Sequence, residues 1–257
     1  MIKLEAIYRY PIKSLSGQAL DKVQLRHNQP IIYDRHWALA HASSPIKSQM
    51  ASWTFKHDFL NLCRDNKLAQ LQSDFDEKSL KLSLSRKGRM LVQGRMDDAM
   101  GRMLIQDFLS NFLGAGSRSN PTIIEAAPDQ HFQDHKHGYF SLINLASLQD
   151  LQDRVMRMPI NKMRFRGNFY ISGLKPWQEF DLVGQTIEFN QTRFKILEPI
   201  ERCAATNVNI EHGQQAGTQD MNIPLGLRRA LGHINCGVFL GLEQEGELSN
   251  HETARIA

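Results

Sequence analysis

Cys203 is the residue whose neighbours most suggest chemistry. It follows Arg202 directly in segment 202–209 (RCAATNVN), just after an expected strand that ends near Pro199. A neighbouring guanidinium favours the thiolate over the thiol, and only the thiolate is a nucleophile or a metal ligand. The alternative is a small buried apolar side chain, the usual role of a lone cysteine. The residue pattern by itself leaves both interpretations open.

The other cysteines and the histidines are weaker candidates. Cys63 and Cys236 lie in apolar segments and fit the buried role better. Three cysteines are an odd number and lie far apart, so we expect no disulfide framework, and an iron–sulfur cluster would need four. His212 or His233 could suit a zinc site or a Cys-His hydrolase, but no C-x-x-C pair accompanies them. We expect His233 to cap carbonyl groups at a helix end or to pack against neighbouring side chains, and residues 131–137 to form a surface loop.

Charge and hydropathy narrow the class of protein. The net charge of +4 and the pI near 9.0 suit an anionic small molecule as well as a nucleic acid. The sequence has no zinc-finger, KH-type or RRM-type signature, so we do not expect nucleic-acid binding. It has no run of eighteen apolar residues, and residues 1–10 alternate polar with apolar types. We therefore expect no membrane span and no secretory signal, and a cytoplasmic location.

The first half of the chain predicts strands and one helix. Residues 2–10 alternate with the period of a half-buried strand and lead to a loop at residues 13–14. Residues 68–71 and 80–84 predict a hairpin, with a turn over residues 73–78. A helix is expected from Asp97 to Gly114. Its expected core face carries Met100, Met103, Leu104, Phe108, Phe112 and Leu113.

The second half predicts a further β-rich unit. The Gly- and Ser-rich stretch 114–121 suggests a boundary between units at 1–118 and 119–249. Short β-prone runs follow at residues 169–171, 186–189, 193–196 and 237–240. Asn144 is expected to cap one short helix, and Pro224 and Gly232 to bracket another. The tail after Glu247 looks loosely ordered. The expected fold is mainly β with a few short helices, in two β-barrel-like units with the site between them.

Five motifs, in order along the chain, resemble the MOSC family. Segment 202–209 is similar to its R-C-x-x-T-x-V-[DN] signature. The other matches are residues 10–14 (YPIKS) followed by Gly17, residues 34–37 (DRHW), residues 164–168 (RFRGN), and residues 220–224 (DMNIP) with 232–233 and 236–238. This family includes the mitochondrial amidoxime reducing component and the C-terminal part of molybdenum cofactor sulfurase.

The resemblance implies a site and a cofactor. In the family, the cysteine sulfur binds molybdenum held by the dithiolene of a phosphorylated pterin, so Cys203 would be the metal ligand of a molybdenum cofactor. The matching motifs would hold the cofactor through Lys13, Ser14, Arg35, Arg166, Asn168 and Arg202. Fixed cations and hydroxyls at these positions suit a phosphate.

The resemblance also implies a reaction, with some departures. The expected function is an oxidoreductase that reduces N-hydroxylated compounds, such as hydroxylamines and amidoximes, with electrons from a separate donor protein. The alternative is a non-catalytic carrier or a sulfur-transfer protein for the cofactor. Asn209 stands where many members have aspartate, and an amide there could still orient a substrate at the catalytic centre. The usual closing turn is replaced by residues 246–250 (GELSN), which leaves the last strand open.

Overall fold

The computed structural model describes the chain apart from residues 47–52, 116–117, 119, 128–129, 136–139 and 212. The predictions for His212 and for residues 136–137 therefore lie outside the described residues. The predicted class, mainly β with a few short helices, is confirmed. No helix in the described part of the chain is both long and apolar enough to cross a membrane.

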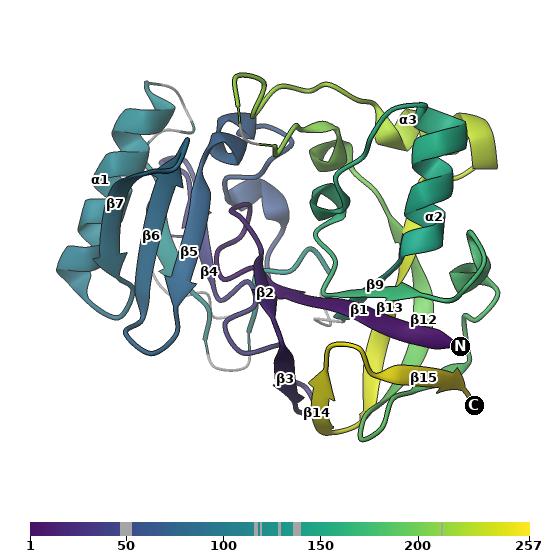
Figure 1. The fold of residues 1–257 in the computed structure, drawn as a ribbon. Coiled ribbons are helices and arrows are strands. Elements are labelled where there is room, and N and C mark those ends of the chain that lie inside the picture. Colours follow the sequence, from purple (N-terminus) through teal and green to yellow (C-terminus); the bar gives the residue numbers. More distant parts are fainter. Residues whose placement is uncertain (47–52, 116–117, 119, 128–129, 136–139, 212) are drawn as a thin grey trace.

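Seven strands close into a barrel at the lower right of Figure 1. In order around the barrel they are β1 (Ile2–Arg9), β10 (Phe169–Ser172), β9 (Phe140–Asn144), β13 (Asn235–Gln244), β12 (Arg193–Glu201), β11 (Thr186–Glu188) and β15 (Thr253–Ile256). Antiparallel pairing of β1 with β10 closes the ring, with Leu4 opposite Ile171. Inward-facing residues of these strands form the barrel core, in which Leu4, Ile7, Phe169 and Phe194 are fully buried.

Both ends of the chain contribute to the barrel, because β1 is N-terminal and the other six strands follow residue 139. β2 (Gln18–Leu20) extends the sheet beside β1. Further pairs join β3 (Lys22–Leu25) to β14 (Gly246–Ser249) and β4 (Trp37–Ala40) to β8 (Thr122–Glu125). The boundary at residue 118 stays a prediction. The prediction of a loose C-terminal tail is wrong, because Leu248 is fully buried and β15 pairs with β1 and β11.

A three-stranded sheet forms a second unit at the left of Figure 1, covered by a helix. It contains β5 (Gln72–Asp76), β6 (Lys81–Arg86), β7 (Arg89–Arg95) and α1 (Ala99–Leu113). The predicted hairpin is present, but its first strand was placed too early. Leu68 lies in a 3-10 helix, and Phe75, expected in the turn, is a buried strand residue.

The predicted helix is confirmed as α1, with Asp98 accepting a hydrogen bond from the Gly101 backbone at 2.8 Å. Its predicted core face is wrong in part. Met100, Met103 and Leu104 are exposed, whereas Gly101, Ile105 and Leu109 are buried. The reason is a close backbone approach: a Cβ on Gly101 would lie 2.3 Å from the Arg95 carbonyl oxygen. This contact turns the stripe that begins at Gly101 toward the sheet.

The remaining helices are short and lie mainly near the strand ends. They are α2 (Leu145–Asp150) with a π-helical continuation (Leu151–Met156), α3 (Ile223–Leu231), and 3-10 helices at Lys56–Asp58, Asn66–Gln70, Lys162–Phe165, Gln178–Phe180 and Ala204–Asn207. Asn144 caps α2 and Gly232 ends α3 in a left-handed conformation, as the sequence predicts.

Candidate functional site

A cavity of about 660 Å³ collects most of the residues that the motifs single out. Its volume is within the range of about 300–1,000 Å³ typical of small-molecule sites. The predicted residues that line it are Lys13, Ser14, Arg35, Arg166, Asn168, Arg202 and Cys203. They come from loops at the ends of barrel strands and from the loop before β4.

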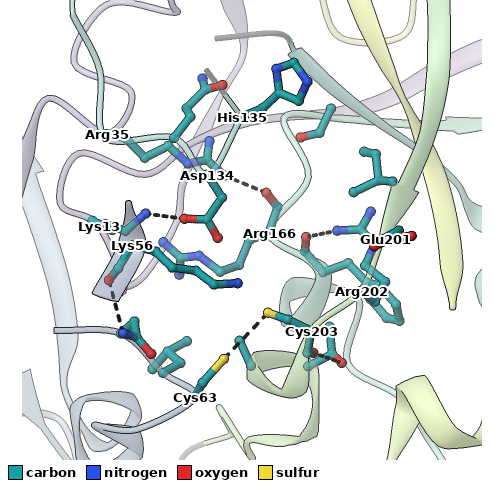
Figure 2. Close-up of a pocket in the computed structure, with 18 of the residues that line it drawn as sticks. Lys13, Arg35, Lys56, Cys63, Asp134, His135, Arg166, Glu201, Arg202 and Cys203 are labelled. Carbon is teal, nitrogen blue, oxygen red and sulfur yellow. Dashed lines mark hydrogen bonds and ion pairs between the residues drawn. The ribbon is translucent and has the colours of Figure 1, made fainter. Parts of the chain in front are cut away.

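The cavity wall holds Cys203 in the loop between β12 and the 3-10 helix Ala204–Asn207. Its Sγ lies 3.6 Å from Sγ of Cys63. Figure 2 shows the two sulfurs facing each other. A hydrogen bond from the Cys63 thiol lowers the pKa of Cys203, and the Ala205 backbone N–H and the Lys56 ammonium lower it further, against the opposing effect of burial. The same contact raises the pKa of Cys63. Of the two thiols, Cys203 is therefore the one whose ionisation its surroundings favour.

One expectation about these sulfurs is wrong. Cys63 is not a buried apolar residue but a half-buried thiol on the cavity wall. Arg202 attracts the Cys203 thiolate as expected, although its guanidinium also binds carbonyl oxygens of Phe165 and Cys236, and Lys56 is a second cation that favours the thiolate. In Figure 2 the Lys56 side chain points toward the two sulfurs. Its ammonium makes no hydrogen bond or ion pair with any of the residues that the structure describes.

Arg35 and Arg166 form a cationic pair over one buried ring. Their guanidinium carbons lie 4.4 and 4.3 Å from the ring centroid of Tyr10. Asp34 pairs with Arg35 at 2.6 Å, but Arg166 has no ion pair among the described residues. Burial first, and then the neighbouring Arg35, lower the pKa of Arg166 to about 10. A buried guanidinium that lacks a counter-charge would be stabilised by an anion in the cavity.

The backbone is strained at three predicted residues. Ser14, Arg35 and Arg166 have φ angles of 72°, 49° and 52°. Residues other than glycine rarely adopt this left-handed region, and such conformations are concentrated at functional sites. These three residues come from separate loops, and all of them line the cavity.

Lys13 already has an anionic partner. Its ammonium donates to the carbonyl oxygen of Phe132 at 2.7 Å and to Asp134 at 2.5 Å (Figure 2). Burial lowers the pKa of Lys13, and although burial alone would raise the pKa of Asp134, the lysine lowers it overall. Asp134 is therefore a charged cavity residue that no motif identified.

The other predicted residues have structural partners as well. Asn168 accepts hydrogen bonds from Ser141 and donates to Asp34 at 3.2 Å, and Ser14 donates to the Leu60 carbonyl oxygen at 3.2 Å. Arg202 links the end of β12 to Cys236 of β13 and to Phe165 through its carbonyl contacts. These side chains line the cavity and also hold its walls together.

Asn209 is not among the residues that line the cavity. Its amide donates to Asp220 at 2.8 Å, and Asp220 in turn accepts two hydrogen bonds of 2.8 Å from Arg164, whose side chain is 2% exposed. This position lets Asn209 stabilise the base of the signature loop.

Sequence reasoning missed Lys56, Cys63 and Asp134 as cavity residues. Lys56 and Cys63 carried no signal, since they lie outside every motif and reach the site only through tertiary packing. Asp134 lies in the polar stretch 131–137, which was assigned to a surface loop. That assignment is wrong for His131, which is buried, and burial lowers its pKa to about 4. His233 packs as expected, with its ring 5.4 Å from that of Phe180.

The donor set fits a phosphorylated pterin that carries molybdenum. Cys203 offers a soft thiolate, which suits this metal. Arg166 offers a buried guanidinium without an ion pair among the described residues, and Lys56 offers an ammonium close to the sulfur. Arginine and lysine are the usual partners of phosphate oxygens.

Comparisons with known proteins agree with the motifs. The chain matches the family models "MOSC N-terminal beta barrel domain" over residues 1–115 and "MOSC domain" over residues 128–254. It is 24% identical to molybdenum cofactor sulfurase of Oryza sativa subsp. japonica over 283 aligned residues, which cover 96% of this chain. The chain spans about a third of the length of that relative, 33%.

Two solved structures are more distant. The YUAD protein from Bacillus subtilis matches with a TM-score of 0.47 and 13% identity, over 100% of this chain and 96% of that one. YiiM from Geobacillus stearothermophilus matches with a TM-score of 0.36 and 14% identity, over 46% of this chain and 53% of that one. The two family models together match nearly the whole sequence, and the chain belongs to the MOSC family.

Proposed function

We propose that the cavity binds the molybdenum cofactor through Cys203, and that the protein is an oxidoreductase that reduces N-hydroxylated compounds such as hydroxylamines and amidoximes. The observation that carries this proposal is the position of the Cys203 sulfur on the wall of a cation-lined cavity. When bound, the cofactor would supply the two-electron chemistry that removes oxygen from an N–O bond.

The residues of the chain would bind and orient the cofactor. Arg166 and Arg35 would hold the phosphate, because a guanidinium offers two parallel donors to its oxygens. Lys56 would balance the negative charge around the Cys203 sulfur. Asp134, held by Lys13, is the ionised carboxylate that could accept a proton within the cavity. Electrons would come from a separate donor protein in the cytoplasm.

A non-catalytic role in carrying the cofactor or its sulfur is the second candidate. The similarity to a protein named molybdenum cofactor sulfurase favours it. A carrier would need the same cations and the same sulfur, so the lining residues do not separate the two functions. A turnover measurement separates the two functions, because only the oxidoreductase consumes electrons when an N-hydroxylated compound is added.

The test is an activity assay on protein purified with its cofactor from a competent host. With a reduced viologen dye as electron donor and hydroxylamine or benzamidoxime as substrate, we expect dye oxidation that requires the substrate. Cys203→Ser should abolish it, and Cys236→Ala, which changes a buried thiol outside the cavity lining, should retain it. Tight molybdenum binding without turnover would support the carrier, and full turnover by Cys203→Ser would refute both.

A further inference from the structure

Two thiols from distant parts of the chain meet in the cavity. Cys63 and Cys203 are 140 residues apart in sequence, and their sulfur atoms are 3.6 Å apart. We propose that they form a thiol–disulfide site, in which Cys63 converts the oxidised form of Cys203 into a reversible disulfide. The proposal concerns the chain's own sulfurs and does not require the cofactor.

The geometry needs only a small movement. A disulfide bond is about 2.05 Å long, so the two sulfurs must approach by roughly 1.5 Å. Cys63 lies in a turn and Cys203 in a loop, so neither is held in a helix or a strand ladder. Rotation about the Cα–Cβ bonds and a slight shift of either loop can therefore bring the sulfurs together.

The Cys63 loop is positioned rather than loose. Asp65 accepts a hydrogen bond from the Asn61 backbone N–H at 2.8 Å, which closes the turn around Cys63. Arg118 binds the same carboxylate at 3.0 Å and also donates to the Phe59 carbonyl oxygen at 2.6 Å. These contacts hold the turn that presents the Cys63 thiol to Cys203.

Both sulfurs can be reached from the cavity, and the third cysteine cannot. Cys63 and Cys203 are half-buried and line the cavity, whereas Cys236 is fully buried in the core beside α2 and α3. Small oxidants such as hydrogen peroxide can thus enter and meet the pair. Cys236 provides a matched control within the same chain.

The oxidation proceeds in two balanced steps. The Cys203 sulfur attacks hydrogen peroxide: an S–O bond forms, the O–O bond breaks, water leaves, and the sulfur is oxidised by two electrons to a sulfenic acid. The Cys63 sulfur then attacks the Cys203 sulfur, the S–S bond forms, the S–O bond breaks, and a second water leaves with the thiol proton. A small dithiol returns two electrons and two protons and restores both thiols.

The disulfide would have one consequence for the proposed function. It occupies the sulfur to which that function assigns the metal, so oxidised chain would not take up cofactor until it is reduced. The second thiol would also stop Cys203 short of the irreversible sulfinic acid.

The test uses the full chain made in a host without the pterin pathway, treated with a small excess of hydrogen peroxide. We expect free thiols in the denatured chain to fall from three to one, with a dithiothreitol-reversible cross-link mapped between the Cys63 and Cys203 peptides. Cys63→Ser should instead accumulate a Cys203 sulfenic acid that dimedone traps. Cys236→Ala should form the cross-link as the wild type does.

Several results would overturn the proposal. They are three unchanged thiols in the wild type, a cross-link that involves Cys236, or equal formation of Cys203 sulfinic acid in the wild type and in Cys63→Ser. The wild-type measurement needs no variant, so it stands even if a variant folds poorly. Because this chain contains no cofactor, the outcome is independent of whether molybdenum binding is confirmed.

Discussion

Replacement of Asp34 by asparagine tests whether the cavity wall depends on a single buried carboxylate. Asp34 is 1% exposed. It accepts hydrogen bonds from the Tyr10 backbone at 2.8 Å, from Arg35 at 2.6 and 2.8 Å, and from Gln133 and Asn168 at 3.2 Å. These donors come from four separate segments of the chain. An asparagine would turn one acceptor atom into a donor and leave the largely buried Arg35 without its counter-charge.

The expected cost follows from this geometry. Removal of one partner from a buried ion pair costs about 3–5 kcal/mol, because the remaining charge is buried and unpaired. For a chain of this size the melting temperature should fall by roughly 6–20 °C, at about 2–4 °C per kcal/mol.

Urea unfolding followed by circular dichroism measures the effect. The midpoint should fall while the m-value stays constant, since the native surface changes little. Asp97→Asn is the control, because it breaks the pair with Arg95 on the exposed surface and should leave the midpoint unchanged. A loss below about 1 kcal/mol for Asp34→Asn, the size of an ordinary hydrogen bond, would refute the central role of this carboxylate.

Three further predictions concern the surroundings of the site. Burial alone would raise the pKa of Asp220, but the pairing with Arg164 lowers this pKa overall. The ionised Asp220 therefore stabilises the fold fully above about pH 4, the usual pKa of an aspartate in an unfolded chain, and this contribution is lost as the pH falls through the lower pKa of the folded state. Asp220→Asn should therefore flatten the dependence of urea stability on pH at the acid end, and an unchanged slope would contradict the pairing. Gly237→Ala should lower stability by about 1–3 kcal/mol in the same unfolding assay and displace Arg202, because φ is 77° and the new Cβ would lie 2.5 Å from a carbonyl oxygen; wild-type stability would show that the strand can relax at this position. Arg166→Met should leave the cofactor-free melting temperature nearly unchanged and weaken pterin retention on gel filtration by about tenfold or more, since a charge-assisted hydrogen bond is worth about 1.5–3 kcal/mol; equal retention would place the phosphate elsewhere.

Local motifs predicted the fold and much of the cavity because their residues lie next to strand ends. Lys13 follows β1, Arg166 precedes β10 and Cys203 follows β12, and these three strands belong to one closed barrel. Once the barrel closes, the loops that carry the motifs meet. The family motifs therefore gave a set of residues that converge in space, apart from Asn209.

The features that sequence reasoning missed depend on tertiary contacts. Cys63 meets Cys203 across 140 residues, and no local pattern encodes that proximity. The direction of Arg202 depends on the left-handed backbone conformation of Gly237 in β13, next to the Cys236 carbonyl oxygen that accepts from the guanidinium. The buried face of α1 depends on Gly101, where the helix touches the sheet. In each of these cases the local sequence is compatible with more than one arrangement, and tertiary packing determines which one forms.

Elemental analysis is the most direct test of the molybdenum site. Protein made in a host that synthesises the pterin should contain about one molybdenum atom per chain, and Cys203→Ser made in the same host should contain almost none, because the soft ligand is lost. Cys236→Ala should retain the metal. Full molybdenum content in Cys203→Ser, or none in the wild type, would contradict the assignment of this cysteine as the metal ligand.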